Sequence, residues 1–313
     1  HSGSSLYCQK FLGAVMSATK FVQSNSIRMA YESMGPDEGT VIILVAGLYN
    51  QLIRWPTAFC ELLIAHGYRV IRFDNRDIGL TEKMDNQTAP TLFRLALRSL
   101  FGIPAEVPYT LEDMADDTVG LMDALDIEKA HIVGMSMGGM ISQLVACLYP
   151  ERILSLTSIM STTGAFGKGM ASFAVARQMV KSIPNGVSAL ENSVNTRQMF
   201  ASPAYPQTDE EVAAEVRREF QRSNYPAGYL RQMAAIRVAP NRKNLLRQLK
   251  LPTLIIHGNQ DTLVDVSGGI ETKKRIAHAK LVRFEGMGHT LPDALLERFA
   301  DLIHETASQA RTN

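Results

Sequence analysis

IVGMSMGGM, residues 132–140, predicts a buried strand that stops at Ser136 and continues as a helix. Gly134 and Gly138 stand two positions before and after the serine. A residue at the tip of so sharp a turn has a strained backbone, and bulkier neighbours at these two positions would collide with it. The turn therefore exposes the Ser136 hydroxyl, and N–H groups of the helix that begins near Met137 point toward any oxyanion formed there.

The sequence on both sides supports this prediction. Ile132 and Val133 are β-branched and apolar, as in a central strand of a parallel sheet. Residues 140–149 have helical character until Pro150 ends the helix. Because a Gly-x-Ser-x-Gly pattern often arises by chance, this context is what makes Ser136 a candidate nucleophile.

The composition argues against several classes of protein. Of the 313 residues, 46% are hydrophobic and 20% are charged, and the formal net charge is +1, so nothing indicates a nucleic acid partner. No run approaches the roughly 18 apolar residues of a membrane span. Cys8, Cys60 and Cys147 lack the spacing of a zinc site or a disulfide scaffold, which favours a reducing compartment. We expect a cytoplasmic protein, with secretion as the weaker alternative, and the sequence predicts no oligomeric state.

The first residues differ in character from the rest of the chain. Residues 1–15 begin without methionine and contain no apolar segment of signal-peptide length. We interpret them as a remnant of the expression vector, with Met16 as the natural start.

Short apolar segments bounded by Gly, Pro or Asn predict strands along most of the chain. They cover residues 20–23, 27–32, 41–45, 69–73, 131–134, 153–160, 253–257 and 280–284. Helical patterns occupy residues 56–66, 111–125, 137–148 and 291–307. This alternation predicts an α/β fold, a mostly parallel doubly wound sheet with helices on both faces. The first two strands are close enough in sequence to form an antiparallel hairpin.

The pattern changes between Ser161 and Pro252, where the strand signals disappear. Helical segments at 170–183, 187–200, 209–221 and 228–238 are separated by Pro, Gly and Asn. We interpret residues 164–245 as a helical cap inserted into a core formed by residues 16–163 and 246–313. The alternative is a separate interaction domain, which the immediate return to sheet-like sequence disfavours.

His289 is the strongest candidate for the base that a serine nucleophile requires. It follows the strand predicted at 280–284 and ends the loop Gly286-Met287-Gly288-His289, whose glycines let the backbone bend. The other histidines have no comparable setting, and we interpret His257, which ends a strand beside Gly258, as a core or hydrogen-bonding residue.

A carboxylate should orient the imidazole of His289. Asp261 follows the buried strand at 253–257 after a tight turn, and Asp265 is the alternative four residues further on. Asp261 would fix the imidazole tautomer and stabilise the imidazolium, while His289 would act first as general base and then as general acid.

Two backbone N–H groups are expected to stabilise an oxyanion beside Ser136. One belongs to Met137, the residue after the nucleophile. The other lies in the loop Ala46-Gly47-Leu48-Tyr49, after the strand at 41–45, where Gly47 permits a close approach and Leu48 is the expected donor.

These motifs resemble the α/β-hydrolase superfamily, in its cap-bearing group of bacterial serine esterases, which includes carboxylesterases, methylesterases and perhydrolase-like enzymes. The resemblance covers residues 19–307, and the order Ser136, Asp261, His289 is that of the family's triad, which favours Asp261 over Asp265. Residues 73–81 are similar to the family's Asp-x-Arg-Gly-x-Gly-x-Ser turn, with Asp77 in place of a glycine and Thr81 in place of a serine.

The resemblance also limits the roles of several residues. In the family that turn is mainly structural, so we assign no catalytic role to Asp74, Arg76 or Asp77. Ala46 stands where many relatives have histidine before the oxyanion glycine, but the backbone donor does not depend on that side chain. Ser136 argues against the branches that use an aspartate nucleophile.

The resemblance implies a serine hydrolase that cleaves a carboxylic ester through an acyl-enzyme, without metal or organic cofactor. We expect a carboxylesterase for small to medium apolar esters, and the expected partner is a small-molecule ester. The same triad also supports carbon–carbon bond hydrolysis, lactone opening, peroxyacid formation and cyanohydrin cleavage. A noncatalytic ligand-binding protein on the same fold is the remaining alternative.

The substrate pocket is the part of the site that the sequence predicts least directly. Trp55 lies close in sequence to the oxyanion loop, and the cap is rich in methionine and phenylalanine. We expect pocket contacts from Trp55, Met170, Phe173 and Met199, although packing between helices explains any one cap residue better.

Overall fold

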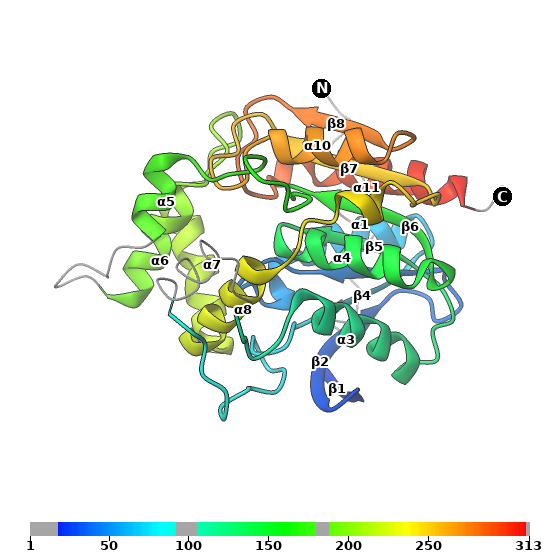
Figure 1. The fold of residues 1–313 in the computed structure, drawn as a ribbon, viewed down its shortest axis with the longest axis horizontal. Helices are drawn as coiled ribbons and strands as arrows, with labels where there is room; N and C mark the ends of the chain where they lie inside the picture. Colours follow the sequence, from blue (N-terminus) through cyan, green and yellow to red (C-terminus); the bar gives the residue numbers. More distant parts are fainter. Residues whose placement is uncertain (1–17, 92–104, 180–187, 311–313) are drawn as a thin grey trace, which may run out of the picture.

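The structure is a computed structural model that describes residues 18–91, 105–179 and 188–310 (Figure 1). Its centre is an eight-stranded sheet in the order β1-β2-β4-β3-β5-β6-β7-β8. The strands are β1 Lys20–Ser24, β2 Ile27–Met34, β3 Val41–Val45, β4 Arg69–Phe73, β5 Ala130–Met135, β6 Ile153–Ile159, β7 Thr253–Gly258 and β8 Lys280–Phe284. β1 and β2 form the expected antiparallel hairpin, β2 also runs antiparallel to β4, and the remaining pairs are parallel. The prediction of a mostly parallel α/β sheet is confirmed.

Helices cover both faces of this sheet (Figure 1). α3 and α4 pack on one face, and α1 and α11 pack together on the other. The bounds are α1 Thr57–Ala65, α3 Leu111–Ala124, α4 Met137–Leu148, α10 Ser267–Arg275 and α11 Leu296–Gln309. Three short 3-10 turns occupy Leu52–Arg54, Pro150–Arg152 and Asp293–Leu295. α10 was not predicted from the sequence, and the helix expected at 291–307 divides into a 3-10 turn and α11.

Alternate residues of β3 show how the sheet is buried on both faces. Ile43 and Val45 belong to the apolar cluster beneath α3 and α4, whereas Ile42 and Leu44 belong to the cluster beneath α1 and α11. All four side chains are fully buried. A strand buried on both faces is a continuous apolar run, which explains why these strands were visible in the sequence without an alternating pattern.

The chain between β6 and β7 carries helices α5 to α9. Their bounds are α5 Phe173–Met179, α6 Ala189–Gln198, α7 Asp209–Arg222, α8 Pro226–Val238 and α9 Lys243–Leu246. α5 to α8 gather at one end of the sheet, on the left in Figure 1. The helix expected at 170–183 begins at Phe173, and its part beyond Met179 lies outside the described residues, as does the N-terminal segment 1–15.

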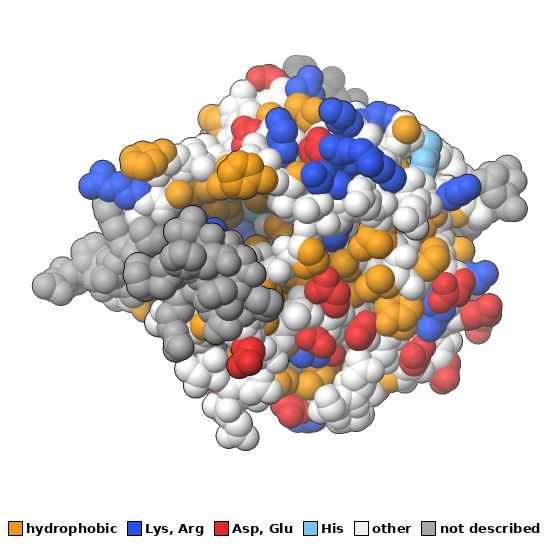
Figure 2. Space-filling view, viewed as in Figure 1, with side chains coloured by type: hydrophobic (Ala, Val, Ile, Leu, Met, Phe, Trp, Pro, Cys, Tyr) orange, Lys and Arg blue, Asp and Glu red, His pale blue; other side chains and the backbone are white. Residues whose placement is uncertain are grey.

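Three apolar side chains lie on the surface of this insertion. Phe166, Met170 and Phe173 are 102%, 59% and 85% exposed. Figure 2 shows hydrophobic side chains on this face near α5.

No helix within the described ranges is both long and apolar enough to cross a bilayer.

Candidate active site

Ser136 occupies the sharp turn between β5 and α4. Its φ is 55° and its ψ is −121°, a left-handed region that side-chain-bearing residues adopt only under strain. The Ser136 N–H donates to the carbonyl of Ile159 on the neighbouring strand β6 at 2.9 Å. The sheet therefore holds the serine backbone in a conformation that the isolated chain would avoid.

The two flanking glycines are required by close backbone contacts. A Cβ on Gly134 would lie 2.1 Å from the carbonyl oxygen of Gly138. A Cβ on Gly138 would lie 2.1 Å from the carbonyl oxygen of Val45, at the end of β3. The glycines thus let strand, turn and helix pack against one another, whereas the sequence had predicted collisions with Ser136 itself.

His289 lies between Ser136 and Asp261. Its Nε2 is 3.0 Å from the Ser136 Oγ, and its Nδ1 is 2.7 Å from the Asp261 Oδ2. Asp265 is not part of this arrangement, because its Oδ1 accepts the N–H of Ser267 at the start of α10. The structure therefore brings together the three residues that the sequence suggested and leaves the alternative acid outside.

Asp261 is held in place from several sides. Its Oδ1 accepts the N–H groups of Leu263 and Val264 at 2.9 and 2.8 Å, so the loop after β7 folds around the carboxylate. Burial raises the pKa of Asp261, but His289 and His257 oppose this and bring the pKa well below its usual range. Asp261 is therefore a carboxylate at neutral pH, the form that can accept a hydrogen bond from the His289 Nδ1.

His257 has a contact that the sequence did not reveal. Its imidazole is fully buried, as expected of a core residue, and its Nε2 donates to the Val264 carbonyl at 2.7 Å. The same nitrogen is 3.5 Å from the Asp261 Oδ2. His257 therefore packs beneath the acid and also supports the loop that surrounds it.

The loop after β3 lies directly against Ser136. A Cβ on Gly47 would be 3.2 Å from the Ser136 Cβ, so the glycine allows this loop to approach the serine closely. Among the described residues, no acceptor contacts the backbone N–H of Leu48 or of Met137. The backbone N–H of Tyr49, the residue after Leu48, donates to the Oε1 of Gln232 in α8 at 2.9 Å. Two backbone donors are thus left available close to Ser136.

A recess opens beside His289, between the core and the insertion. Its walls combine apolar and polar side chains, from Arg54, Arg197, Gln198, Phe200, Ala201, Ser202, Tyr205, Gln207, Val212, His289 and Thr290. The Phe200 ring meets the His289 ring edge to face, with centroids 6.5 Å apart. Arg54 and Arg197 are ion-paired with Glu215 and Glu219 of α7, so the charges of this wall are balanced.

The four residues expected to line a pocket do not line this recess. Trp55 is wholly buried in the core, stacked on Phe59 with ring centroids 5.6 Å apart, because the chain turns inward immediately after the 3-10 turn Leu52–Arg54. Met170 and Phe173 lie on the outer surface of the insertion. Met199 is half-buried beside the recess, where its carbonyl accepts the hydroxyl of Thr262 at 2.9 Å.

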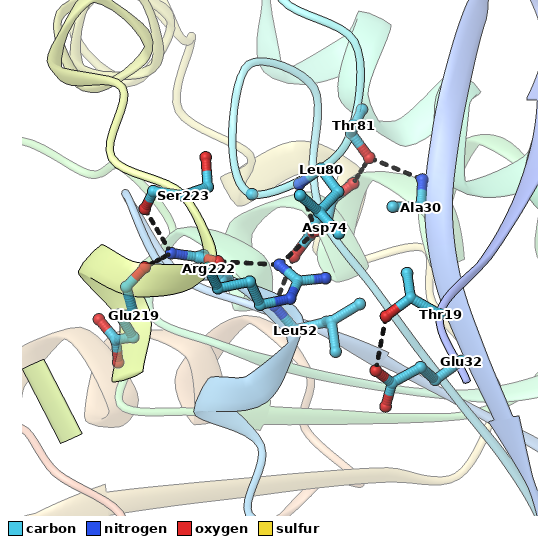
Figure 3. Close-up of polar contacts among 12 residues, drawn as sticks. Thr19, Ala30, Glu32, Leu52, Asp74, Leu80, Thr81, Glu219, Arg222 and Ser223 are labelled. Atoms are coloured by element: carbon cyan, nitrogen blue, oxygen red, sulfur yellow. Dashed lines mark hydrogen bonds and ion pairs between the residues drawn. The ribbon is translucent and has the colours of Figure 1, made fainter. Parts of the chain in front are cut away.

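A buried ion pair fastens α7 to the turn after β4 (Figure 3). The Arg222 Nη1 donates to the Asp74 Oδ2 at 2.7 Å and to the Gln51 Oε1 at 2.8 Å. The Asp74 carboxylate also accepts the N–H groups of Leu52 and Leu80. Burial raises the pKa of Asp74, and the guanidinium and the two N–H donors counteract this shift.

A second buried ion pair fastens α8 to the same turn. Arg231 donates through Nε and Nη2 to both carboxylate oxygens of Asp77, at 2.7 and 2.9 Å. Asp77 has a φ of 70°, which explains why the related turn has glycine at this position. The substitution of aspartate for glycine thus provides a partner for Arg231 in the insertion.

We expect Arg222→Met to lower the free energy of unfolding by about 3–5 kcal/mol, because it leaves the buried Asp74 carboxylate without its guanidinium. Urea denaturation at pH 7 measures this loss. A buried carboxylate without a counter-ion has a raised pKa, so the loss should be largest at neutral pH and should shrink as the pH falls and Asp74 is protonated.

Arg218→Met is the matched control, since Arg218 is an exposed arginine on the same helix. Its effect should stay within about 0.5 kcal/mol. Equal midpoints and slopes for the two variants would show that the Arg222–Asp74 pair does not stabilise the fold.

Comparisons with known proteins agree with the fold. A family model described as alpha/beta hydrolase fold matches residues 40–293. Rhodomycin D methylesterase DnrP of Streptomyces peucetius is 27% identical over 91% of this chain and 96% of its own length. The 2-hydroxymuconate semialdehyde hydrolase of Pseudomonas sp. strain CF600 is 29% identical over 66% of this chain and 72% of its own length. The crystal structure of the meta-cleavage product hydrolase CumD of Pseudomonas fluorescens IP01 superposes with a TM-score of 0.71 at 24% identity, over 93% of this chain and 98% of CumD.

Proposed function

Because the chain belongs to the α/β-hydrolase family and its relatives are named hydrolases, we propose that it cleaves a carboxylic ester through an acyl-enzyme intermediate. The observation that carries this proposal is the double contact of His289, with Ser136 at 3.0 Å and with Asp261 at 2.7 Å. A hydrolase that uses a metal-bound water would not need a histidine so placed against a strained serine.

In this mechanism the Ser136 Oγ attacks the ester carbonyl while the His289 Nε2 takes the hydroxyl proton. Asp261 accepts the hydrogen bond of the Nδ1–H and stabilises the imidazolium. The oxyanion receives hydrogen bonds from the N–H groups of Leu48 and Met137, and losing one such donor typically costs about 2.7–4 kcal/mol in the transition state. His289 then gives its proton to the leaving alcohol, and water activated by the same histidine releases the acid and restores Ser136.

The insertion, residues 164–245, serves as the cap over the core formed by residues 16–163 and 246–313. Support comes from the buried pairs of Arg222 with Asp74 and of Arg231 with Asp77, which join it to the loops at the carboxyl ends of the strands. Phe200, Tyr205 and Val212 give the recess an apolar portion. This supports small to medium, mainly apolar esters as substrates.

Carbon–carbon bond hydrolysis is the second candidate function, because the similar protein from Pseudomonas is named a semialdehyde hydrolase. The same nucleophile, base and donors would serve that reaction, as they would lactone opening or peroxyacid formation. A noncatalytic binding role is disfavoured by the strained φ of Ser136, since a binding protein gains nothing from holding a serine in that conformation.

A panel of p-nitrophenyl esters, from acetyl to decanoyl, tests the proposal directly. We expect hydrolysis that falls off for long acyl chains, together with covalent labelling of Ser136 by a fluorophosphonate. Labelling without hydrolysis of any ester would reject the esterase activity. It would still indicate that Ser136 is an activated nucleophile for another class of substrate. Folded protein that the fluorophosphonate does not label would reject the whole serine mechanism.

A further inference from the structure

One segment of the insertion runs alongside the loops that carry Asp261 and His289. This segment, residues 199–204, follows α6 and is called the strap here. The Phe200 carbonyl accepts the backbone N–H of His289 at 2.8 Å, and the Ala204 N–H donates to the Gly286 carbonyl at 3.0 Å. The Met199 carbonyl accepts the hydroxyl of Thr262, the residue after Asp261. The strap therefore contacts both the loop that carries Asp261 and the loop that carries His289.

The glycines of the histidine loop are required by this contact. A Cβ on Gly288 would lie 2.2 Å from the Ala201 carbonyl oxygen, and a Cβ on Gly286 would lie 2.1 Å from the Ala204 Cβ. Gly286 also has a φ of 70°. The loop thus contains glycine beside His289 so that the strap can lie directly against its backbone.

Among the strap residues, Ser202 alone has a side chain that hydrogen-bonds both to the residue before His289 and to the residue after it. It is 1% exposed. Its Oγ accepts the N–H of Gly288 at 2.9 Å and is 2.5 Å from the Oγ1 of Thr290. The residues immediately before and after the histidine are therefore fixed by one buried hydroxyl.

We propose that Ser202 is a positioning residue for His289, through which the cap holds the imidazole within reach of Ser136. The inference rests on the proposed function, because it concerns the same histidine. Ser202 acts through the backbone of the loop, since the contacts of its hydroxyl are to Gly288 and Thr290. Proton transfer from serine to histidine depends steeply on their separation, and misplacement by 1 Å can lower a rate by about a hundredfold.

Ser202→Ala removes the acceptor of a buried N–H and allows the loop to shift. We expect kcat to fall by about ten- to a hundredfold while KM changes by less than about threefold. The rate of fluorophosphonate labelling at Ser136 should fall by a similar factor. Ser202→Thr, which keeps the hydroxyl, should recover most of the labelling rate.

Ser193→Ala is the matched control, because Ser193 lies in the cap on α6 and its hydroxyl donates to the Ala189 carbonyl within that helix. It should leave kcat and the labelling rate unchanged. Both variants are measured at a temperature well below their unfolding midpoints, so that a purely structural loss of stability does not lower the rate per folded molecule.

Thr290→Val provides a second test if Ser202→Ala does not fold. It removes the partner that orients the Ser202 hydroxyl and should lower the labelling rate in the same direction by a smaller factor. If the wild-type protein is labelled and Ser202→Ala or Thr290→Val is labelled at the same rate, the positioning role is overturned while the proposed function stands. A wild-type protein that is not labelled overturns the proposed function itself.

Discussion

Replacing Ser136 with alanine is expected to lower kcat for ester hydrolysis by about 10⁵- to 10⁶-fold. Without the Oγ no acyl-enzyme can form, and His289 has no proton to accept. The fold should persist, because alanine meets the same backbone strain at a φ of 55° that serine already bears. The measurement is steady-state hydrolysis of the best p-nitrophenyl ester, with intact-mass analysis after fluorophosphonate treatment.

Two results would count against this expectation. Turnover within tenfold of the wild type would place the chemistry elsewhere, and a mass shift in the alanine variant would identify another reactive nucleophile. Ser193→Ala, on α6, should behave as the wild type in both assays.

Asp261→Asn is expected to lower kcat by about 10⁴-fold, because an amide in place of the carboxylate favours the wrong tautomer of His289 and cannot stabilise its imidazolium. Asp265→Asn is the matched control four residues away. The Oδ1 of Asp265 accepts the N–H of Ser267, a role that an asparagine oxygen can take over. Its kcat should remain within about threefold of the wild type. A larger loss in Asp265→Asn than in Asp261→Asn would reverse the assignment of the acid.

The lowered pKa of Asp261 adds a dependence on pH. A carboxyl group whose pKa in the folded state lies below its unfolded value, about 3.9, stabilises the fold above that pH. This contribution is lost as the pH falls through the folded-state pKa. The difference in free energy of unfolding between wild type and Asp261→Asn should therefore change little between pH 7 and pH 5 and become smaller below about pH 4.

The parts of the fold that depend on local sequence were predictable. β3, β4 and β8 have the predicted bounds, and other strands differ by a few residues at their ends, because short apolar runs between Gly, Pro and Asn indicate a strand wherever it lies. Ser136 could also be predicted, since the Gly-x-Ser-x-Gly pattern lies within one short stretch of sequence, although the close contact of Gly138 is with Val45 of β3. His289 and Asp261 were predicted because each follows a strand end, and the chain order of the family's triad favoured Asp261 over Asp265.

The contacts made by the insertion had no such signal. Arg222 and Asp74 are 148 residues apart, and Arg231 and Asp77 are 154 apart. An arginine on a helix has the same appearance in the sequence whether it faces solvent or a buried carboxylate. Ser202 was missed for the same reason, as a serine in a linker between two helices.

The four predicted pocket residues do not line the recess, because hydrophobicity alone does not say which surface a side chain joins. Trp55 follows the oxyanion loop closely in sequence, yet it completes the core beneath α1 and α11. Met170 and Phe173 are as apolar as expected and face outward. The recess is instead lined by residues such as Arg54 and Gln198, which no hydrophobic pattern distinguishes.

The bond between Gln232 of α8 and the N–H of Tyr49 has a consequence for the engineering of this protein. Through it, a helix of the insertion contacts the loop after β3, just as the strap contacts the loop that carries His289. If the proposed function holds, the insertion is thus a structural component of the active site as well as its cap. A chimaera that borrows the corresponding helices of a relative to change substrate preference must also carry over the donors and acceptors at positions 202, 222, 231 and 232. A graft chosen only for the shape of its pocket would also remove these contacts between the insertion and the core.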